Sequence, residues 1–529
     1  MNSKEGSNQS IGRSMLQISA LTFGSRIFGL IRDIVMAAYW GGTGAAQAAF
    51  QVAFAFPNSL RTLFGEGAFT SAFVPMLSAR MKDDKREEAW QLAERAISVQ
   101  ALALLVFVLL LSGLSVAVLW FAPETLSAHA RLTFMILPIL MPYALFICMA
   151  GAFSSVLNCL GDFKVPAATP ILFNILQIAT VIYLSFLWAN TEFIALLIFC
   201  ASALLAGLLQ LLVLMLWARR RGFVFHFRPV WKAPEVQQLC QKILPGLLGA
   251  GVMQINSLVD RLLALHLGPA AVGALNYSQH LVYLPVGIFG VAMSVVCLPR
   301  MSRATARADN AEIANSLDYA LRMILFLSLP CATLLFALQE QTVMLLFARG
   351  AFTAEAVRET CWALSFYILG LPAFCCAKVA TNPFHARLDT TTPVKVAIFC
   401  MVLNLVLNLI LMQFLRQGGL ALSTSICSWL NVILLLRLNR RHLPQWSPMT
   451  LLRDGLLLLK LALLAALGAT VTVKVLQRPG LLPPAASPLV HNAILLLLPA
   501  IIGGLIYLFG CLLIRRPELH EFRQIIQRR

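Results

Sequence analysis

The sequence is poor in charged residues. Only 12% of its 529 residues are Asp, Glu, Lys or Arg, whereas soluble domains carry about 25%. Acidic residues are the scarcer kind, at 23 against 41 basic ones, while 59% of all residues are hydrophobic. Water therefore cannot be the main solvent of this chain. Because apolar runs of about 20 residues recur, each long enough to cross a bilayer as a helix, we expect an all-α polytopic membrane protein.

The sequence also lacks the patterns that mark several enzyme classes. Its 12 cysteines are scattered, without the paired spacing of a zinc or redox site. It has no Gly-rich phosphate loop, no carboxylate cluster at a membrane face and no nucleophile constellation. A membrane enzyme such as a glycosyltransferase is therefore disfavoured, and we expect no catalytic residue.

Fourteen apolar segments predict fourteen transmembrane helices. Their approximate ranges are residues 14–38, 46–77, 96–121, 132–157, 166–188, 193–217, 243–267, 272–298, 321–338, 361–381, 393–414, 419–436, 455–473 and 492–514. Lys and Arg gather in loops that follow even-numbered helices and in the C-terminal tail, so the positive-inside rule predicts that both termini are cytoplasmic. The formal net charge of +18 then reflects membrane topology, and we expect no nucleic-acid partner.

An internal repeat predicts two lobes. Asp162 and Asp389 each close a short loop ahead of an apolar run and lie 389 − 162 = 227 residues apart, and Pro57 and Pro285 lie 285 − 57 = 228 apart. Six helices repeated once enter the membrane in the same direction, which predicts a parallel pseudo-twofold pair of lobes around a central cavity. The expected parts are a cytoplasmic leader (1–13), an N-lobe of six helices (14–218), a basic cytoplasmic linker (219–242), a C-lobe of six helices (243–441), an appended helix pair (442–514) and a basic cytoplasmic tail (515–529).

Charged residues interrupt the apolar runs of the first two expected helices. They are Arg26, Arg32, Asp33, Arg61 and Glu66. A charge at this depth costs about 2.5–3.5 kcal/mol on insertion scales, so it normally faces a partner or a water-filled cavity. In one interpretation Arg32 pairs with Asp33. Arg61 then pairs with Glu66, and these charges only stabilise the helix bundle. In the other interpretation, the surplus of cations lines a cavity.

The seventh and eighth expected helices add three more polar groups. They carry the adjacent, pairable residues Asp260 and Arg261, and His280. Over both halves the cations outnumber the carboxylates. This balance favours an anionic substrate, because guanidinium groups bind phosphate through two parallel hydrogen bonds.

Five segments together resemble one transporter family. SRIFGLIRD (residues 25–33) and FPNSLRTLFGEGAFTSAFVP (56–75) lie on the first two expected helices, and LN (157–158), LFARGAFT (346–353) and ARLDTTTPVK (386–395) follow. These segments are similar to the signature of the MurJ (MviN) lipid II flippases, which belong to the MOP (multidrug/oligosaccharidyl-lipid/polysaccharide) exporter superfamily. Together they cover nearly the whole chain.

The resemblance implies a function and a set of binding residues. A flippase of this family moves lipid II, an undecaprenyl-pyrophosphate-linked peptidoglycan precursor, from the cytoplasmic to the periplasmic leaflet of the bacterial inner membrane. It does so by alternating access, driven by an ion or by the membrane potential. The residues expected to contact the pyrophosphate and headgroup are Ser25, Arg26, Arg32, Asn58, Arg61, Arg261 and His280, with Asp33 and Glu66 as charge partners.

The resemblance also implies a candidate binding site for sodium as the coupling ion. We expect no other cofactor. Its ligands would be Asp260, Asn404, Asn408 and Thr424. Asn404 and Asn408 are four residues apart and therefore share a helix face. In membrane helices such amides more often hold neighbouring helices together, and this interpretation stays open.

The chain departs from the family pattern at three positions. Ala48 stands where the family has an Asp, His280 where it has an Arg, and Tyr283 where it has an acidic residue. His280 is either a ligand contact, a group that titrates near neutral pH or a packed neutral side chain. The expected partners are lipid II, membrane lipids and the cell-wall synthesis machinery, with a monomer favoured. The appended helix pair would either hold the lipid tail, as the resemblance implies, or simply pack against the other helices.

Two other transport functions stay open at this stage. A MATE-like cation-coupled drug antiporter of the same fold would need an acidic cavity, whereas the charges here are mainly basic. A flippase for another polyprenyl-pyrophosphate oligosaccharide would have the same charge balance. Only the motif over residues 25–33 and 56–75 separates that alternative from lipid II.

Overall fold

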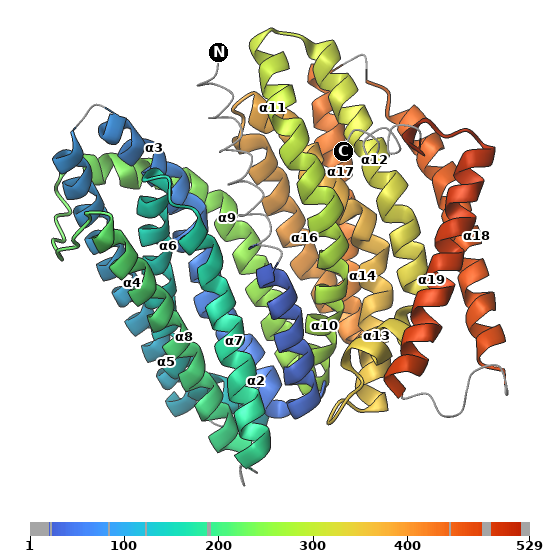
Figure 1. The fold of residues 1–529 in the computed structure, drawn as a ribbon, viewed down its shortest axis with the longest axis horizontal. Coiled ribbons are helices and arrows are strands. Elements are labelled where there is room, and N and C mark those ends of the chain that lie inside the picture. The colour runs from blue at the N-terminus through green and yellow to red at the C-terminus, as the bar shows by residue number, and fades with distance from the viewer. Residues whose placement is uncertain are drawn as a thin grey trace. The chain divides into compact units, whose positions relative to one another are not determined.

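A computed structural model describes residues 21, 24–82, 85–121, 124–187, 192–443, 446–478 and 488–519. Within these ranges every regular element is a helix (Figure 1). The chain is therefore all-α, as the composition predicts. The expected leader (1–13) and most of the basic tail lie outside the described residues.

The helices follow one another along the chain with short connections. After a first helix over residues 24–40 they are α2 (Ala45–Leu60), η1 (Arg61–Gly67), α3 (Ala68–Lys82), α4 (Arg86–Phe121), α5 (Ala128–Leu140), α6 (Pro142–Cys159), α7 (Lys164–Leu187), α8 (Glu192–Arg220), α9 (Pro234–Leu267), α10 (Pro269–Pro285), η2 (Val286–Val291), α11 (Ala292–Ala306), α12 (Asn310–Ala337), α13 (Gln339–Phe347), α14 (Ala354–Ala380), α15 (Asn382–Ala386), α16 (Thr391–Leu415), α17 (Gln417–His442), α18 (Pro448–Leu476) and α19 (Pro488–Leu513). Here η marks a π-helix.

Eleven helices of the described ranges are long and apolar enough to cross a membrane, or twelve if the bent helix α9 counts as one span. All fourteen predicted segments fall on helix where they are described, to within a residue or two at their ends. The count of fourteen spans is nevertheless not confirmed. The first segment extends into residues that are not described, and α5 (Ala128–Leu140) is too short to qualify alone. The stretch from α2 to α3 contains Gln47, Gln51 and Arg61, which lower its hydropathy.

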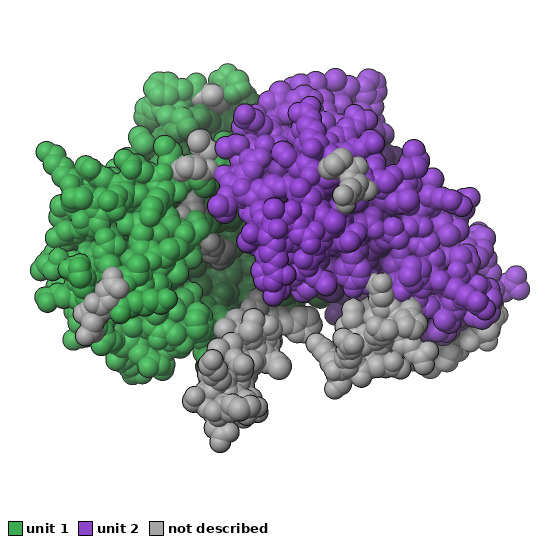
Figure 2. All heavy atoms as spheres, turned by 90° about the horizontal axis from the view of Figure 1, so that it is seen from above, with its two compact units in different colours: residues 1–269 green, residues 270–529 purple. Residues whose placement is uncertain are grey.

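The chain divides into two compact units, residues 1–269 and residues 270–529 (Figure 2). The repeat places the start of the C-lobe at residue 243. By contacts, however, α9 belongs to unit 1, because it packs against α2, α3 and η1. Sequence self-comparison and helix packing therefore divide the chain at different points.

Each unit contains a π-helix shortly after a proline of the repeat. Pro57 lies inside α2, four residues before η1 begins, whereas Pro285 ends α10 immediately before η2. A proline removes one backbone donor and crowds the preceding turn, and a π-turn is one way in which a helix absorbs such a break. The later helices α7 and α16 begin 391 − 164 = 227 residues apart, which is the offset found in the sequence. The two π-helices begin 286 − 61 = 225 residues apart, close to that offset.

Two glycines bring η1 against α6 in unit 1. A Cβ atom on Gly151 would lie 2.4 Å from the carbonyl oxygen of Gly65. No side chain fits into that space, so the two backbones touch. This contact fixes the position of η1, whose first residue is Arg61.

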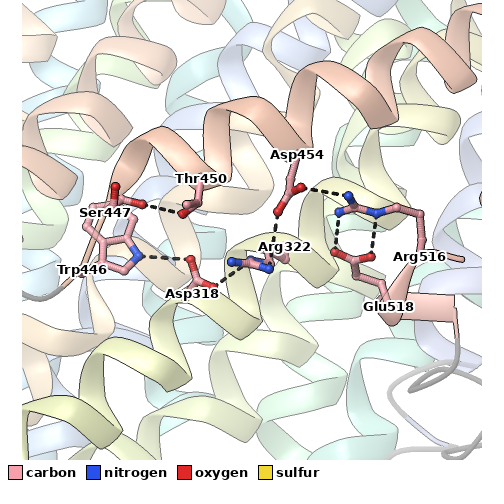
Figure 3. A network of polar contacts seen from close by, with 8 residues as sticks. All are labelled: Asp318, Arg322, Trp446, Ser447, Thr450, Asp454, Arg516 and Glu518. Atoms are coloured by element: carbon pink, nitrogen blue, oxygen red, sulfur yellow. Dashed lines mark hydrogen bonds and ion pairs between the residues drawn. The ribbon is translucent and has the colours of Figure 1, made fainter. Parts of the chain in front are cut away.

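In unit 2 an ion-pair network joins the appended helices α18 and α19 to α12 (Figure 3). Arg322 pairs with Asp318 at 2.7 Å on its own helix and with Asp454 of α18 at 3.4 Å. Arg516, just after α19, pairs at 2.8 Å with both Asp454 and Glu518. These ion pairs connect α18 and the segment just after α19 to α12. They therefore hold the appended helices against the rest of unit 2.

Candidate functional site

Unit 1 contains a polar cavity of about 470 Å³. Among the side chains that the structure describes, its lining includes two arginines and no carboxylate. The lining residues are Ser25, Arg32, Phe54, Asn58, Arg61, Gly65, Thr70, Tyr143, Ile147, Ala150, Gly151, Ser154, Ser155, Asn158, Pro166, Thr169, Pro170, Phe173, Asn174, Gln210 and Leu214. They come from the first helix, α2, η1, α3, α6, α7 and α8. A cation-binding drug site needs the opposite charge, so this lining argues against a cationic substrate.

Arg32 is both paired and part of the cavity wall. Its Nε and Nη2 atoms donate to Oδ1 of Asp33 at 3.0 and 2.7 Å. Its guanidinium also lies 5.7 Å from the centre of the Phe173 ring. Asp33 is only 6% exposed, whereas Arg32 faces the cavity. The two interpretations of these charges are therefore compatible, because Arg32 pairs with Asp33 and still lines a cavity.

Arg61 takes its place at the start of η1, one turn after Asn58. Its Nε donates to the side-chain oxygen of Asn58 at 3.0 Å. The side chain of Glu66, the other predicted partner, lies outside the described residues.

Ser25 and Arg26 are adjacent in sequence, but only Ser25 lines the cavity. Ser25 lines the cavity, and its carbonyl oxygen accepts a hydrogen bond of 3.3 Å from the amide of Asn174. Arg26 is exposed and is not among the cavity-lining residues. Of the candidates in the first two helices, the structure thus brings together Ser25, Arg32, Asn58 and Arg61.

Sequence reasoning did not single out the polar residues that α6, α7 and α8 contribute. These are Ser154, Ser155 and Asn158 on α6, Thr169 and Asn174 on α7, and Gln210 on α8. Asn158 appeared only as part of a resembling motif. The available signal was a hydroxyl or amide group within an apolar run, and residues that merely join helices give the same signal.

Asp260 and Arg261 lie on α9 of unit 1 and are not among the residues that line this cavity. Arg261 donates to the carbonyl oxygen of Gln51 on α2 at 3.3 Å. Asp260 accepts from the amide of Asn256, one turn earlier, at 3.4 Å. Ala48, which replaces a family carboxylate, is buried in the packing of α2.

The remaining candidates lie in unit 2. Asn408 donates to the side-chain oxygen of Asn404 at 3.0 Å, which confirms that they share a helix face. The hydroxyl of Ser423 on α17 donates to the side-chain oxygen of Asn408 on α16, and Thr424 donates to the Leu420 carbonyl at 2.9 Å. The two asparagines therefore contribute to joining α16 and α17.

The other two unusual positions of unit 2 lie on α10. His280 is exposed, and Tyr283 stacks with Phe374 at 6.1 Å between ring centres. Among the described residues no group of three or more His, Cys, Asp or Glu side chains could hold a metal ion. A sodium site built from amide and hydroxyl oxygens is not covered by that search and stays a prediction.

A second, apolar cavity of about 240 Å³ lies in unit 1. It is lined by Phe64, Phe69, Ala96, Val99, Gln100, Ala103, Leu104, Phe107, Trp231, Val236, Leu239, Cys240, Ile243, Leu244 and Leu247. The π-helix η1 contributes to both cavities, with Arg61 and Gly65 lining the polar one and Phe64 the apolar one.

Residues 36–482 match the family described as lipid II flippase MurJ. The chain is also 35% identical over 437 residues to a probable lipid II flippase MurJ of Vibrio cholerae, covering 80% of this chain and 82% of that protein. The chain belongs to the MurJ family. A lipid II flippase MurJ of Burkholderia cenocepacia is 31% identical over 446 residues, or 82% of this chain and 85% of the relative.

Solved structures agree with this membership. A MurJ described as a lipid II flippase in an inward closed conformation matches with a TM-score of 0.77 and 25% identity over 95% of this chain and 99% of that one. An inward-facing MATE family transporter of the MOP superfamily matches with a TM-score of 0.66, covering 82% of this chain and 99% of that one. Its 13% identity shows a shared fold only. The MurJ resemblance is therefore confirmed, and the family is one of lipid II flippases, which are transporters.

Proposed function

We propose that this chain is a flippase that carries lipid II from the cytoplasmic to the periplasmic leaflet of the bacterial inner membrane. One observation carries the proposal. In a member of the MurJ family, Arg32 and Arg61 line one polar cavity, and the described side chains of its wall include no carboxylate. A diphosphate offers only acceptor oxygens at neutral pH, and guanidinium groups are the donors that match it best.

Arg61 and Arg32 differ in their neighbours at the cavity. Arg61 donates from Nε to the neutral side chain of Asn58. Arg32 donates twice to Asp33, so a diphosphate has to share or displace this carboxylate. We therefore propose that both arginines contact the diphosphate and that Arg32 does so in competition with Asp33.

Complementation of a flippase-depleted bacterium tests this proposal. The wild-type chain is expected to restore growth, and Arg61→Ala and Arg32→Ala are expected to fail although the protein accumulates normally. Arg303→Ala is the matched control, because Arg303 is an exposed arginine of α11 outside the cavity. Failure of the wild type to restore growth, or full growth with Arg61→Ala, would contradict the proposal.

We also propose an energy source for transport. Transport by alternating access would use the membrane potential or an ion, with sodium as the candidate held by Asp260, Asn404, Asn408 and Thr424. The flipping rate in cells or proteoliposomes should fall when the potential is collapsed or sodium is replaced by potassium. An unchanged rate under both conditions excludes this coupling.

The location and partners complete the proposal. We place both termini in the cytoplasm, the appended helices α18 and α19 around the lipid tail, and the chain as a monomer that exchanges lipid II with the cell-wall synthesis machinery. Reporter fusions at either end test the orientation. A reporter that is active only in the periplasm should remain silent at both termini.

A further inference from the structure

The polar cavity of unit 1 has two chemically different parts. Among its described lining residues, the cations are Arg32 on the first helix and Arg61 on η1. The part of the wall formed by α6, α7 and α8 is uncharged and contains hydroxyl and amide groups. We call Ser154, Ser155, Asn158, Thr169, Asn174 and Gln210 the neutral wall.

Most side chains of the neutral wall donate their hydrogen bonds to backbone carbonyl oxygens. The hydroxyls of Ser154 and Ser155 donate to the carbonyls four residues earlier at 2.9 and 3.0 Å, and that of Thr169 donates to Pro166 at 3.0 Å. The amide of Asn174 donates to Ser25 and Pro170, each at 3.3 Å, and that of Gln210 to Ala206 at 3.4 Å. The oxygens of these groups therefore serve the cavity mainly as acceptors.

An acceptor surface discriminates between the two parts of a glycosyl diphosphate. A diphosphate carries acceptors only, so it gains nothing from this wall and is attracted to the arginines. A sugar carries several O–H donors, and an N-acetyl sugar adds an N–H. Each of these donors can be satisfied by a hydroxyl or amide oxygen.

The size of the cavity limits what it can hold. A volume of about 470 Å³ lies toward the lower end of the range for small-ligand sites, which is about 300–1,000 Å³. It suits a diphosphate together with one sugar. A disaccharide with a peptide needs more room.

We propose that the neutral wall is a subsite for the first sugar of the substrate, the one bonded to the diphosphate. This inference rests on the proposed function and adds a specificity-determining role for Ser154 and Thr169. Arg61 and Arg32 hold the diphosphate, and the wall accepts hydrogen bonds from the sugar. The chain would then discriminate a sugar-bearing lipid from a bare polyprenyl diphosphate within unit 1.

The test is lipid binding to the purified full-length protein in lipid nanodiscs. Two probes are used, an undecaprenyl diphosphate without sugar and the same lipid with N-acetylmuramoyl-pentapeptide. The double variant Ser154→Ala with Thr169→Val removes two acceptor oxygens and hardly changes volume. It should weaken binding of the sugar-bearing lipid about tenfold, as expected for two neutral hydrogen bonds. Binding of the bare lipid should stay within about twofold, since no diphosphate contact is lost.

Two controls separate recognition from folding. Ser154→Thr with Thr169→Ser keeps both hydroxyls and should bind both lipids like the wild type. Arg61→Ala should weaken both lipids alike, because the diphosphate is common to them. The thermal midpoint of each variant is measured in the same preparation.

The outcomes distinguish a failure of the sugar subsite from a failure of the proposed function. Equal weakening of both lipids by the double variant, or no weakening of either, overturns the sugar subsite while leaving the diphosphate site intact. Equal affinity of the wild type for both lipids has the same meaning. If the wild type binds neither lipid, or if Arg61→Ala changes nothing, the proposed function itself fails.

Discussion

Arg32 donates two hydrogen bonds to a single oxygen of Asp33, its neighbour in the chain, at the edge of the polar cavity. The carboxylate is almost fully buried, so the pair is held in place and its net charge is close to zero. Under the proposed function a bound diphosphate would compete with Asp33 for the same guanidinium. We therefore expect the pair to set how strongly, and how reversibly, the cavity binds an anion.

Asp33→Asn should bind substrate more tightly and release it more slowly. The variant keeps an acceptor for Arg32 but removes the competing negative charge. We expect the affinity for polyprenyl diphosphate to rise by about threefold to tenfold, which corresponds to about 1 kcal/mol, and the flipping rate to fall. Binding to nanodiscs and flipping in proteoliposomes measure the two effects. Weaker binding by this variant would show instead that Asp33 chiefly orients Arg32.

Gly151→Ala should disturb η1 and destabilise unit 1. The added methyl would lie 2.4 Å from the carbonyl oxygen of Gly65, so the two backbones must separate. Overpacking of this kind costs about 1–3 kcal/mol, and it displaces the element that positions Arg61. We expect a lower thermal midpoint and weaker binding of polyprenyl diphosphate.

Gly113→Ala is the matched control for that substitution. Gly113 lies within α4, and a Cβ there has nothing within 4 Å. Alanine favours a helix over glycine by about 1 kcal/mol, so this variant should be as stable as the wild type or slightly more so. Equal destabilisation by both substitutions would argue against a special role for the contact between Gly151 and Gly65.

Arg516→Ala should detach the appended helices from α12. Glu518 is only 3% exposed and would lose its cationic partner, and Asp454 would lose one of two (Figure 3). Breaking a buried ion pair from one side costs about 3–5 kcal/mol. The thermal midpoint of the purified protein should therefore fall. The control is Arg515→Ala, since Arg515 is exposed, and equal thermal midpoints of the two variants would contradict the prediction.

Asp389 should make the stability of the chain depend on pH. Hydrogen bonds from the side chain and backbone of Thr392, joined by those of Thr391, lower the pKa of Asp389 to about 2. Because the folded pKa is depressed, its contribution is fully present above the unfolded value of about 3.9. It is lost as pH falls toward about 2.

The Asp389→Ala variant tests this dependence. The substitution should lower the thermal midpoint at pH 7 by about 1–2 °C, since it removes a cap from α16. The difference from the wild type should shrink below about pH 4. Asp389→Asn keeps the acceptor without the titrating proton. A difference between wild type and Asp389→Ala that stays constant down to pH 2.5 would exclude the carboxylate as its cause.

The sequence predicts the helices of this fold well because lipid imposes a strong constraint. Each apolar run has to satisfy its own backbone hydrogen bonds, so the segments expected from hydropathy fall on helices. The same constraint makes charges in the membrane conspicuous, and for that reason the sequence alone points to Arg32 and Arg61. The repeat offset at Asp162 and Asp389 also gives the starts of α7 and α16.

Other features leave no comparable signal. A π-helix retains the apolar character of its neighbours, so η1 and η2 are invisible to hydropathy although Pro57 and Pro285 mark their places. Ser154 and Gln210 face a cavity, yet their residue types are those that join membrane helices anywhere. The grouping of α9 with unit 1 depends on contacts between distant segments, which a periodic pattern does not encode.

The paired π-helices also show how the two halves differ. Both follow a matching proline, so the same kind of backbone break recurs in each half. Four residues after the proline, the first half has Arg61 and the second has Phe289. At this distance from the break the first half therefore presents a cation and the second an aromatic ring.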